Sequence, residues 1–233
     1  MKHLQTIHAK VLLLFCFSIA LHFPGVHGGT PLLLTIHSAH AQWDTAGIRL
    51  SELKVAPAAV GTGLMAAGSA FTFVPTVNNL QVALRDNIVQ SSMPKIHVDD
   101  YLQYTTAVAP LALNICGLKS RHTTGRLALL EGGSYLLGAG WLNAFKYGIG
   151  VLRPDNSRYN SFPSGHTFVA FTGAEILRRE YGKEYPWIAV AGYAAAVIVG
   201  AMRVYNNRHW AGDVLAGAGL GIASVTLVYW ALD

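Results

Sequence analysis

Charged residues are scarce in this chain, and their scarcity excludes several classes of protein. Only 12% of its 233 residues are Asp, Glu, Lys or Arg, about half the share of roughly 25% found in soluble domains. By contrast, 52% are hydrophobic and the mean hydropathy is +0.35. The composition therefore excludes a disordered chain and argues against an ordinary water-exposed globular domain. In a chain with so few charges, the net charge of +5 reflects the membrane face on which the cations lie, or an anionic ligand. It is weak evidence for a nucleic-acid partner.

Cysteine is scarce as well. The chain has two, Cys16 and Cys116, and both lie in apolar runs. Neither a disulfide framework nor a cysteine metal site can be built from them. The histidines ahead of residue 42 are scattered and lack the spacing of a known metal site. The sequence therefore gives no sign of a resident metal ion.

Strand signals are also poor, because apolar and polar residues rarely alternate and Ala, Gly and Leu dominate the apolar positions. Several of the apolar stretches suit the length of about 20 residues that a helix needs to cross a bilayer. The five long stretches, and a shorter sixth, cover residues 55–84, 101–118, 127–145, 187–202, 214–232 and 166–177. We therefore predict an all-α helical bundle of about five or six helices that spans a membrane. Buried helices of a soluble bundle are the alternative.

The N-terminus has the pattern of a secretory signal. Residues 1–10 carry two lysines, and residues 11–36 have no charged residue. Ala39-His40-Ala41 offers a small-x-small cleavage site, while prolines and glycines that interrupt the apolar run favour an uncleaved anchor. We therefore expect a signal peptide or N-terminal anchor over 1–41. An apolar or interfacial region over 42–100 and a helical domain over 101–233 would follow.

The positions of the cations predict which loops share a membrane face. Basic clusters at 119–126 and 178–183 fall on one side if each of the intervening apolar stretches crosses once. Short basic loops mark the cytoplasmic side. The loops 146–165 and 203–213 would then share the outer face. This agreement favours a spanning bundle over a soluble one.

The stretch at 55–84 does not fit this count as a single crossing. If an N-terminal signal delivers residue 42 to the outside and 101–118 crosses inward, a single crossing by 55–84 would reverse every later helix. We therefore expect this stretch to lie on the membrane, to pack on the bundle or to form a hairpin. Its prolines and glycines make a weak helix plausible there.

Three short motifs fall in the two outer loops. They are Lys146 with Arg153-Pro154, the run Pro163-Ser164-Gly165-His166, and Arg203 with His209 and Asp213. The lysine and the two arginines supply positive charge, and the arginines can make forked contacts to phosphate oxygens. Ser164 and Gly165 open an apolar helix, where free backbone N–H groups bind anions. Together the motifs predict a phosphate site.

The two histidines suit different steps of a reaction at phosphorus. His209 and Asp213 are four residues apart and share a face on a helix. Asp213 can hold one ring nitrogen and leave the other free to attack phosphorus, while His166 is free to protonate the leaving oxygen. By contrast, we interpret a further set of charged residues as solvated or capping. This set is Asp99, Asp100, Asp155, Arg158, Glu175 and Arg208.

With all spacings in register, the motifs resemble the signature of the type 2 phosphatidic acid phosphatase family, which also includes bacterial acid phosphatases and vanadium haloperoxidases. The resemblance covers about residues 127–232 and does not reach the first 100 residues. It implies a helical bundle and a phosphoric monoester hydrolase without metal or cofactor. One departure is Met202, where the family commonly has serine before the arginine, so one supporting hydrogen bond is in question.

The resemblance also implies a role for each motif residue. In the family, the residue matching His209 forms a phosphohistidine, the one matching Asp213 positions it, and the one matching His166 is the general acid. The phosphoryl group is bound by the residues that match Lys146, Arg153, Ser164, Gly165 and Arg203.

We therefore expect a membrane phosphatase that removes a terminal phosphate from a lipid phosphate or pyrophosphate. Its place would be the bacterial inner membrane, with the site facing the periplasm. Candidate substrates are phosphatidic acid, phosphatidylglycerol phosphate, undecaprenyl pyrophosphate and lipid A phosphate. A soluble periplasmic acid phosphatase for small organic phosphates is the main alternative. A vanadate-dependent haloperoxidase and an inactive membrane scaffold are further ones. The sequence leaves the lipid and the oligomeric state open.

Overall fold

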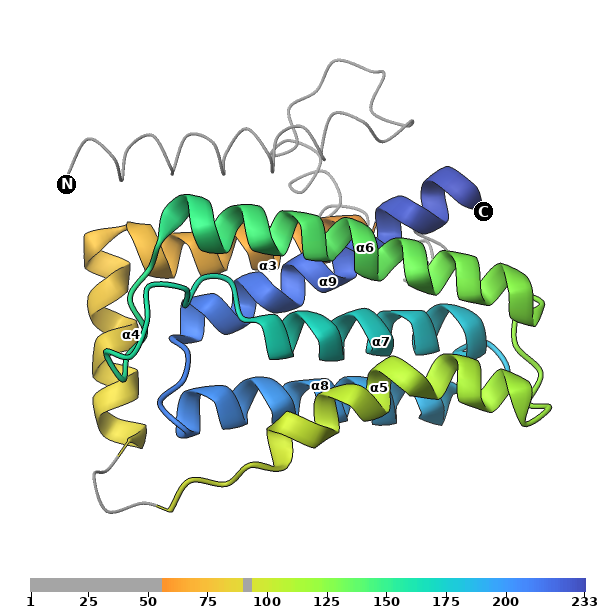
Figure 1. Cartoon of the computed structure of the whole chain (residues 1–233), viewed down its shortest axis with the longest axis horizontal. Helices are drawn as coiled ribbons and strands as arrows, with labels where there is room; N and C mark the ends of the chain where they lie inside the picture. Colours follow the sequence, from red (N-terminus) through yellow and green to blue (C-terminus); the bar gives the residue numbers. More distant parts are fainter. Residues whose placement is uncertain (1–55, 90–93) are drawn as a thin grey trace, which may run out of the picture.

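The computed structural model describes residues 56–89 and 94–233, so the expected signal or anchor over 1–41 lies outside the described residues. The described residues form helices and no strands (Figure 1). The helices are α3 (Ala56–Phe73), α4 (Pro75–Ile88), α5 (Val98–Ile115), α6 (Thr124–Ile149), α7 (Gly165–Tyr181), α8 (Pro186–Tyr205) and α9 (Ala211–Leu232). The predicted all-α bundle is confirmed, with seven helices in the described part instead of five or six.

The additional helix arises because the apolar stretch at 55–84 is broken. Val74 has an extended backbone, and Pro75 begins α4 in its first turn. Proline has no N–H for a helical hydrogen bond and its ring clashes with the preceding turn, so it begins a helix better than it continues one. The two helices meet at 88°. As a result α3 runs along the bundle, whereas α4 lies across one of its ends (Figure 1).

The loops fall into two groups at opposite ends of the bundle. At the end covered by α4, helices α6 and α8 end and α7 and α9 begin (Figure 1). The loops 150–164 and 206–210 therefore share this end. The loops 116–123 and 182–185, next to the basic clusters, lie at the other end. This grouping agrees with the one expected from the alternation of apolar stretches and cations.

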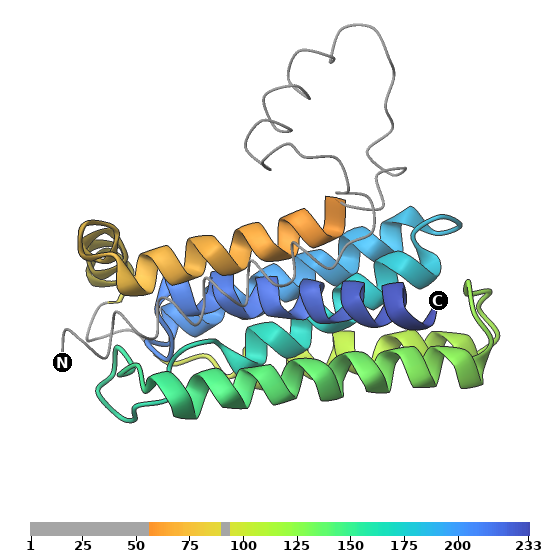
Figure 2. The ribbon, with the colours of Figure 1, turned by 90° about the horizontal axis from the view of Figure 1, so that it is seen from above.

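Helix α9 is the centre of the bundle, and it runs between α3 on one side and α6 on the other (Figure 2). Glycines bring the backbones of α3 and α9 close together. A Cβ atom added at Gly68 would lie 2.4 Å from the carbonyl oxygen of Gly212, and one at Gly219 would lie 2.5 Å from that of Gly61. Small residues at such contacts are typical of helices that pack inside membranes.

Large apolar side chains are exposed along the outer helices. They include Tyr104 and Val108 on α5, Leu129, Leu136 and Trp141 on α6, and Trp187, Val190 and Val197 on α8. Soluble monomers rarely expose contiguous apolar surfaces of this kind. In the described part, α8 and α9 are long and apolar enough to cross a membrane, and the bent pair α3–α4 would be a third span if it counts as one. This is fewer than the five long apolar stretches suggested.

The close contact between α3 and α9 leads to a prediction about the stability of the protein. We expect Gly68→Ala to lower the free energy of unfolding by about 1 to 3 kcal/mol, because the added methyl group overpacks a backbone contact. Gly63→Ala on the same helix is the matched control, since a Cβ atom there meets nothing within 4 Å. It should be neutral or stabilising by up to about 1 kcal/mol. Thermal unfolding in detergent measures both, and equal effects would contradict the packing.

Candidate functional site

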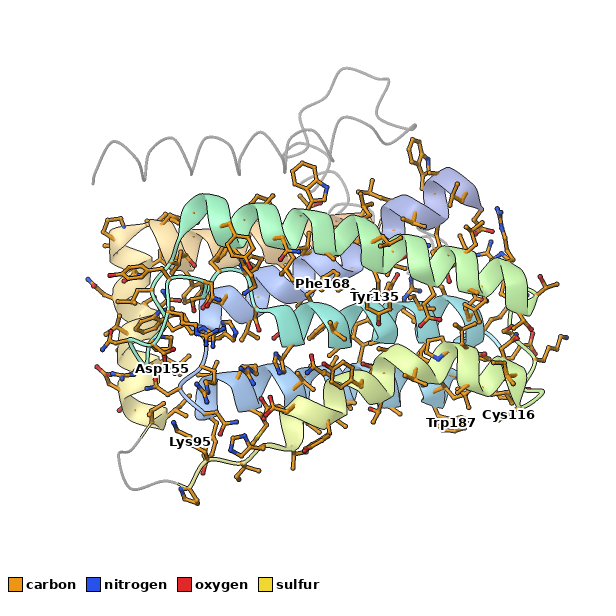
Figure 3. All side chains as sticks on the ribbon, viewed as in Figure 1. Lys95, Cys116, Tyr135, Asp155, Phe168 and Trp187 are labelled. Atoms are coloured by element: carbon orange, nitrogen blue, oxygen red, sulfur yellow. The ribbon has the colours of Figure 1, made fainter. Side chains whose placement is uncertain are left out.

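Two loops far apart in the sequence meet at the end of the bundle that α4 covers. The backbone N–H of Ser164 donates a hydrogen bond to the carbonyl oxygen of Asp213, at 2.9 Å. Ser161 adds a second link, because its hydroxyl donates to the Asp213 carboxylate and lies 3.4 Å from Nδ1 of His209. The second and third motifs therefore lie in direct contact. Lys95 and Asp155 mark the same end in Figure 3, opposite Cys116 and Trp187.

His209 and Asp213 form a buried pair. Nδ1 of His209 lies 3.5 Å from Oδ2 of Asp213, and the two side chains are 2% and 0% exposed. The same Oδ2 atom accepts a hydrogen bond from the backbone N–H of Trp210 at 2.9 Å. The carboxylate is thus fixed at the start of α9. It faces the Nδ1 side of the ring, which leaves Nε2 as the nitrogen that can react.

The surroundings of His209 keep its ring neutral. Burial lowers the pKa of His209 to about 4, and the positive charges of Lys146 and Arg203 act in the same direction, while Asp213 opposes them. A neutral imidazole has a free lone pair on one nitrogen, which a nucleophile or a base requires.

Lys146 and Arg153 converge on one residue, Asn160. The ammonium group of Lys146 donates to the carbonyl oxygen of Asn160 at 2.8 Å, and Nε of Arg153 donates to its side-chain oxygen at 2.9 Å. Lys146 lies in the last turn of α6, and Gly150, which follows the helix with a φ of +67°, turns the chain toward Arg153. Burial, together with the charges of Arg153 and Arg203, lowers the pKa of Lys146 to about 8, although the charge of Asp213 opposes this shift. Positive charges this close together, on Lys146, Arg153 and Arg203, favour the binding of an anion.

Arg203 is held by two acidic residues from the start of α5. Its NH1 group donates to Asp99 at 2.6 Å and to Asp100 at 3.1 Å. The Asp99 side chain is 1% exposed, so the interpretation of Asp99 as a solvated or capping charge was wrong, whereas the Asp100 side chain is 44% exposed. A buried arginine requires a negative partner, and Asp99 supplies it from more than a hundred residues away.

Asp100 also reaches the second histidine. Its Oδ1 atom lies 2.9 Å from Nε2 of His166, so one carboxylate bridges His166 and Arg203. The pKa of His166 is lowered by burial and by the charge of Arg203, although Asp100 and Asp99 oppose this shift. Burial raises the pKa of Asp100, but hydrogen bonds with His166 and His97 and the charge of Arg203 lower it by more.

Glu175, which we also interpreted as a solvated or capping charge, is buried as well, but it is not part of this site. Its side chain is 1% exposed and pairs with Arg178 at 2.7 Å and Arg179 at 2.8 Å. Asp155 pairs with Arg208 at 3.2 Å near the surface, with 15% of the Asp155 side chain exposed. In the described ranges, no group of three or more His, Cys, Asp or Glu side chains is arranged to hold a metal ion.

Residues 156–233 match the family model of the PAP2 superfamily. The lipid A 1-phosphatase of Porphyromonas gingivalis is 42% identical over 137 residues, which is 58% of this chain and 31% of that protein. The undecaprenyl-diphosphatase of Sulfolobus acidocaldarius is 41% identical over 71 residues, 30% of this chain and 32% of that protein. The chain thus spans about a third of the length of these curated relatives.

Two crystal structures share the fold. One is a transmembrane PAP2-type phosphatidylglycerolphosphate phosphatase from Bacillus subtilis, with a TM-score of 0.55 and 22% identity over 76% of this chain and 95% of that one. The other is Aquifex aeolicus LpxE, with a TM-score of 0.51 and 24% identity over 65% of this chain and 95% of that one. The chain therefore shares its helix arrangement with these two proteins, of which the first is described as transmembrane.

The burial of His209 predicts how this residue titrates. In an NMR titration of histidine-labelled protein, its ring should take up a proton only near pH 4. Asp213→Asn should lower the pKa further, because it removes the neighbouring anion that favours the charged ring. A midpoint at or above the ordinary value of 6.5 would contradict the buried, cation-flanked environment.

Proposed function

We propose, from the match of residues 156–233 to the family model of the PAP2 superfamily, that the chain is a membrane phosphatase. It hydrolyses the terminal phosphate of a lipid phosphate or pyrophosphate through a phosphohistidine, without a metal ion. One observation carries the proposal: buried His209 is backed by Asp213 and lies close enough to Lys146 and Arg203 for their charges to lower its pKa.

The phosphate would bind where the positive charges converge. Arg153 and Arg203 would grip its oxygens with forked hydrogen bonds, and Lys146 would add a point charge. The backbone N–H groups at the start of α7, from Gly165 on, point out of the helix N-terminus and suit an anion. The bound phosphate would replace Asn160 as the hydrogen-bond partner of Lys146 and Arg153.

The reaction then needs two steps. Nε2 of His209 attacks phosphorus, the P–O bond to the leaving group breaks, and His166 gives its proton to the leaving oxygen. Asp213 stabilises the positive ring that forms. In the second step a water molecule, deprotonated by His166, attacks phosphorus, the N–P bond breaks, and inorganic phosphate leaves.

The fold supports a lipid as the substrate. The site lies at the end of a bundle whose outer helices expose large apolar side chains. A lipid head group could reach this end while its chains lie along the apolar faces. This arrangement favours the membrane form over the soluble acid phosphatase. A curated relative is named a lipid A 1-phosphatase, which supports the same substrate class.

The sidedness proposal rests on the basic clusters. Those at 119–126 and 178–183 border loops at the end opposite the site. Positively charged loops stay in the cytoplasm. We therefore place the protein in the bacterial inner membrane with the site on the periplasmic face.

Replacement of the nucleophile is the primary test. We expect His209→Ala to reduce phosphate release from a panel of lipid phosphates by at least about 10³-fold, and acid-labile phosphoprotein to disappear in quenched reactions. His122→Ala is the control, since His122 lies at the other end, paired with Glu180 and Asp233. Thermal unfolding confirms that both variants fold. Undiminished phosphate release by folded His209→Ala would refute the proposal.

The two histidines also predict a bell-shaped pH profile of kcat/KM. His209 must be neutral, so activity appears as pH rises through about 4. His166 must be protonated, and its pKa lies below 6.5, so activity is lost as pH rises through that lower value.

Asp100→Asn tests the assignment of the alkaline limb. Loss of this anion lowers the pKa of His166 further, so the alkaline limb should move to lower pH while the acid limb stays in place. Asp86→Asn on α4, an acid that is 56% exposed, is the matched control and should move neither limb. An upward shift of the alkaline limb in Asp100→Asn would contradict the assignment.

A further inference from the structure

Helix α4 lies outside the three motifs, yet it is fixed against the end of the bundle that holds the proposed site. It crosses this end at 88° to α3 (Figure 1). The bend is held by Asn78, whose side chain donates to the carbonyl oxygen of Phe71 at 3.1 Å. Phe73, at the end of α3, packs edge-on against Phe162, with 5.4 Å between the ring centres. Helix α4 therefore has a defined place beside the loop that carries the second motif.

Gln81 of α4 holds the start of α9. Its side chain is buried, with the residue 2% exposed, and the side-chain oxygen accepts a hydrogen bond from the backbone N–H of Gly212 at 3.1 Å. Gly212 lies in the first turn of α9, where backbone N–H groups have no partner within the helix. The adjacent Asp213 is therefore attached to α4 through its neighbour.

Arg85 lies one turn further along the same face of α4, and it contacts both loops of the site. Its Nε atom donates to the side-chain oxygen of Asn207 at 3.0 Å, and its NH2 group donates to the carbonyl oxygen of Pro154 at 3.3 Å. Asn207 lies two residues before His209, and Pro154 directly follows Arg153. One guanidinium group therefore links the loop of the nucleophile to the loop of a phosphate ligand.

The third nitrogen of Arg85 is engaged as well. Its NH1 group pairs with Asp86 at 2.6 Å. All three nitrogens of Arg85 therefore have partners, whereas Nε of Arg203 is buried without a hydrogen bond to the described residues. The contacts of Arg85 suit a residue that holds the loops and not a further phosphate ligand.

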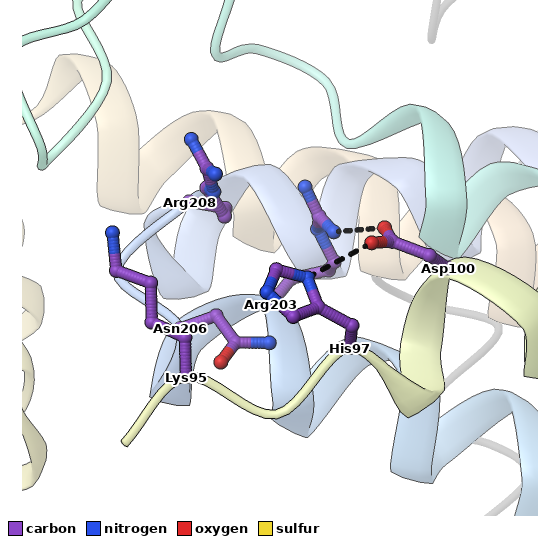
Figure 4. A pocket seen from close by; sticks show the side chains of 6 residues that line it. All are labelled: Lys95, His97, Asp100, Arg203, Asn206 and Arg208. Atoms are coloured by element: carbon purple, nitrogen blue, oxygen red, sulfur yellow. Dashed lines mark hydrogen bonds and ion pairs between the residues drawn. The ribbon is translucent and has the colours of Figure 1, made fainter. Parts of the chain in front are cut away.

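The turn at Asn207 has an unusual backbone. Its φ of +58° is in the left-handed region, which asparagine adopts more readily than most residues other than glycine. Neighbouring side chains reach different partners here. Asn206, which borders the small cavity in Figure 4, donates to the Asp99 carboxylate at 3.0 Å, whereas Asn207 accepts from Arg85. The turn before the nucleophile is therefore held by α5 and by α4.

Two further contacts join the same loops directly. Nε1 of Trp210 donates to the carbonyl oxygen of Leu152 at 2.9 Å, and Arg208 pairs with Asp155 at 3.2 Å. Loss of Arg85 would therefore loosen the loops without separating them. A shift of about 1 Å in a reacting group can reduce a rate about 10²-fold. Even a small movement of one loop against the other would thus slow the reaction.

From these contacts we propose that Arg85 is a positioning residue for the reaction at His209. It keeps the nucleophile and Arg153 at the spacing that one phosphate requires, while Gln81 fixes the start of α9 beside them. Arg85 touches neither the substrate nor the reacting atoms. The inference rests on the proposed function, because that function places a phosphate between the two loops.

Arg85→Ala tests this role through inhibition by orthovanadate, a mimic of the transition state at phosphorus. We expect the inhibition constant to rise about tenfold, because the cations and the nucleophile no longer fit one ligand. The kcat for the lipid phosphate that the wild type hydrolyses best should fall by a similar factor. Unfolding of part of the sample would lower the rate but leave the inhibition constant unchanged, so this readout excludes a merely structural role.

Asn87→Ala is the matched control. Asn87 is exposed in the same turn of α4, and its side chain donates to the carbonyl oxygen of Ala83 within the helix at 2.8 Å. This variant should keep the inhibition constant and the kcat of the wild type. An unchanged inhibition constant in Arg85→Ala, or an equal rise in both variants, would overturn the role of Arg85.

A double-mutant cycle tests the contact itself. Asn207→Gly removes the acceptor of Arg85, and glycine keeps the left-handed backbone. Alone it should raise the inhibition constant at least about threefold, and added to Arg85→Ala it should change the constant by no more than about twofold, because the link is already lost. No effect of Asn207→Gly alone, or effects that multiply in the double variant, would show that the two residues act independently.

Hydrogen exchange separates this inference from the proposed function. In Arg85→Ala, the backbone amides of loops 150–164 and 206–210 should exchange at least about fivefold faster than in the wild type, and those of loop 116–123 at the other end should not change. If the wild type releases phosphate from no lipid phosphate, the proposed function fails, whereas the exchange rates still decide whether Arg85 holds the loops. Equal exchange in the two proteins would overturn the link.

Discussion

The contact between the starts of α7 and α9 is the constraint on which the site depends. The N–H of Ser164 binds the carbonyl oxygen of Asp213 at 2.9 Å, and a Cβ atom at Gly217 would lie 2.5 Å from the carbonyl oxygen of Ser164. Because two backbones approach this closely, the anion-binding end of one helix lies beside the His–Asp pair at the start of the other. Neither half could form the site alone.

The charges of the site are balanced by residues that belong to none of its motifs. Asp99 and Asp100 come from the start of α5 and neutralise Arg203, and Asp100 also contacts His166. A buried arginine without such partners would be costly. Among the described residues, the side chains of Lys146 and Arg153 donate to neutral oxygens of Asn160, so their positive charge is left for a ligand.

The helices and the three motifs could be predicted from the sequence because both leave local patterns, apolar runs and fixed spacings. The prolines and glycines of 55–84 indicated a weak helix, but only the structure shows that it breaks before Pro75 and that α4 turns across the bundle. The roles of Asp99 and Asp100 could not be predicted, because their partners lie far away in the sequence. An acidic pair at the start of an apolar helix looks the same whether it caps the helix or pairs with an arginine. Asn160 has no spacing signal at all.

The central claim is that a phosphate lies between His209 and cations from two separate loops. A crystal structure with vanadate, which mimics phosphorus under attack, tests it most directly. The account predicts vanadium bound to Nε2 of His209, with Lys146, Arg153 and Arg203 on its oxygens. Vanadate bound away from His209, or held by one loop alone, would contradict it.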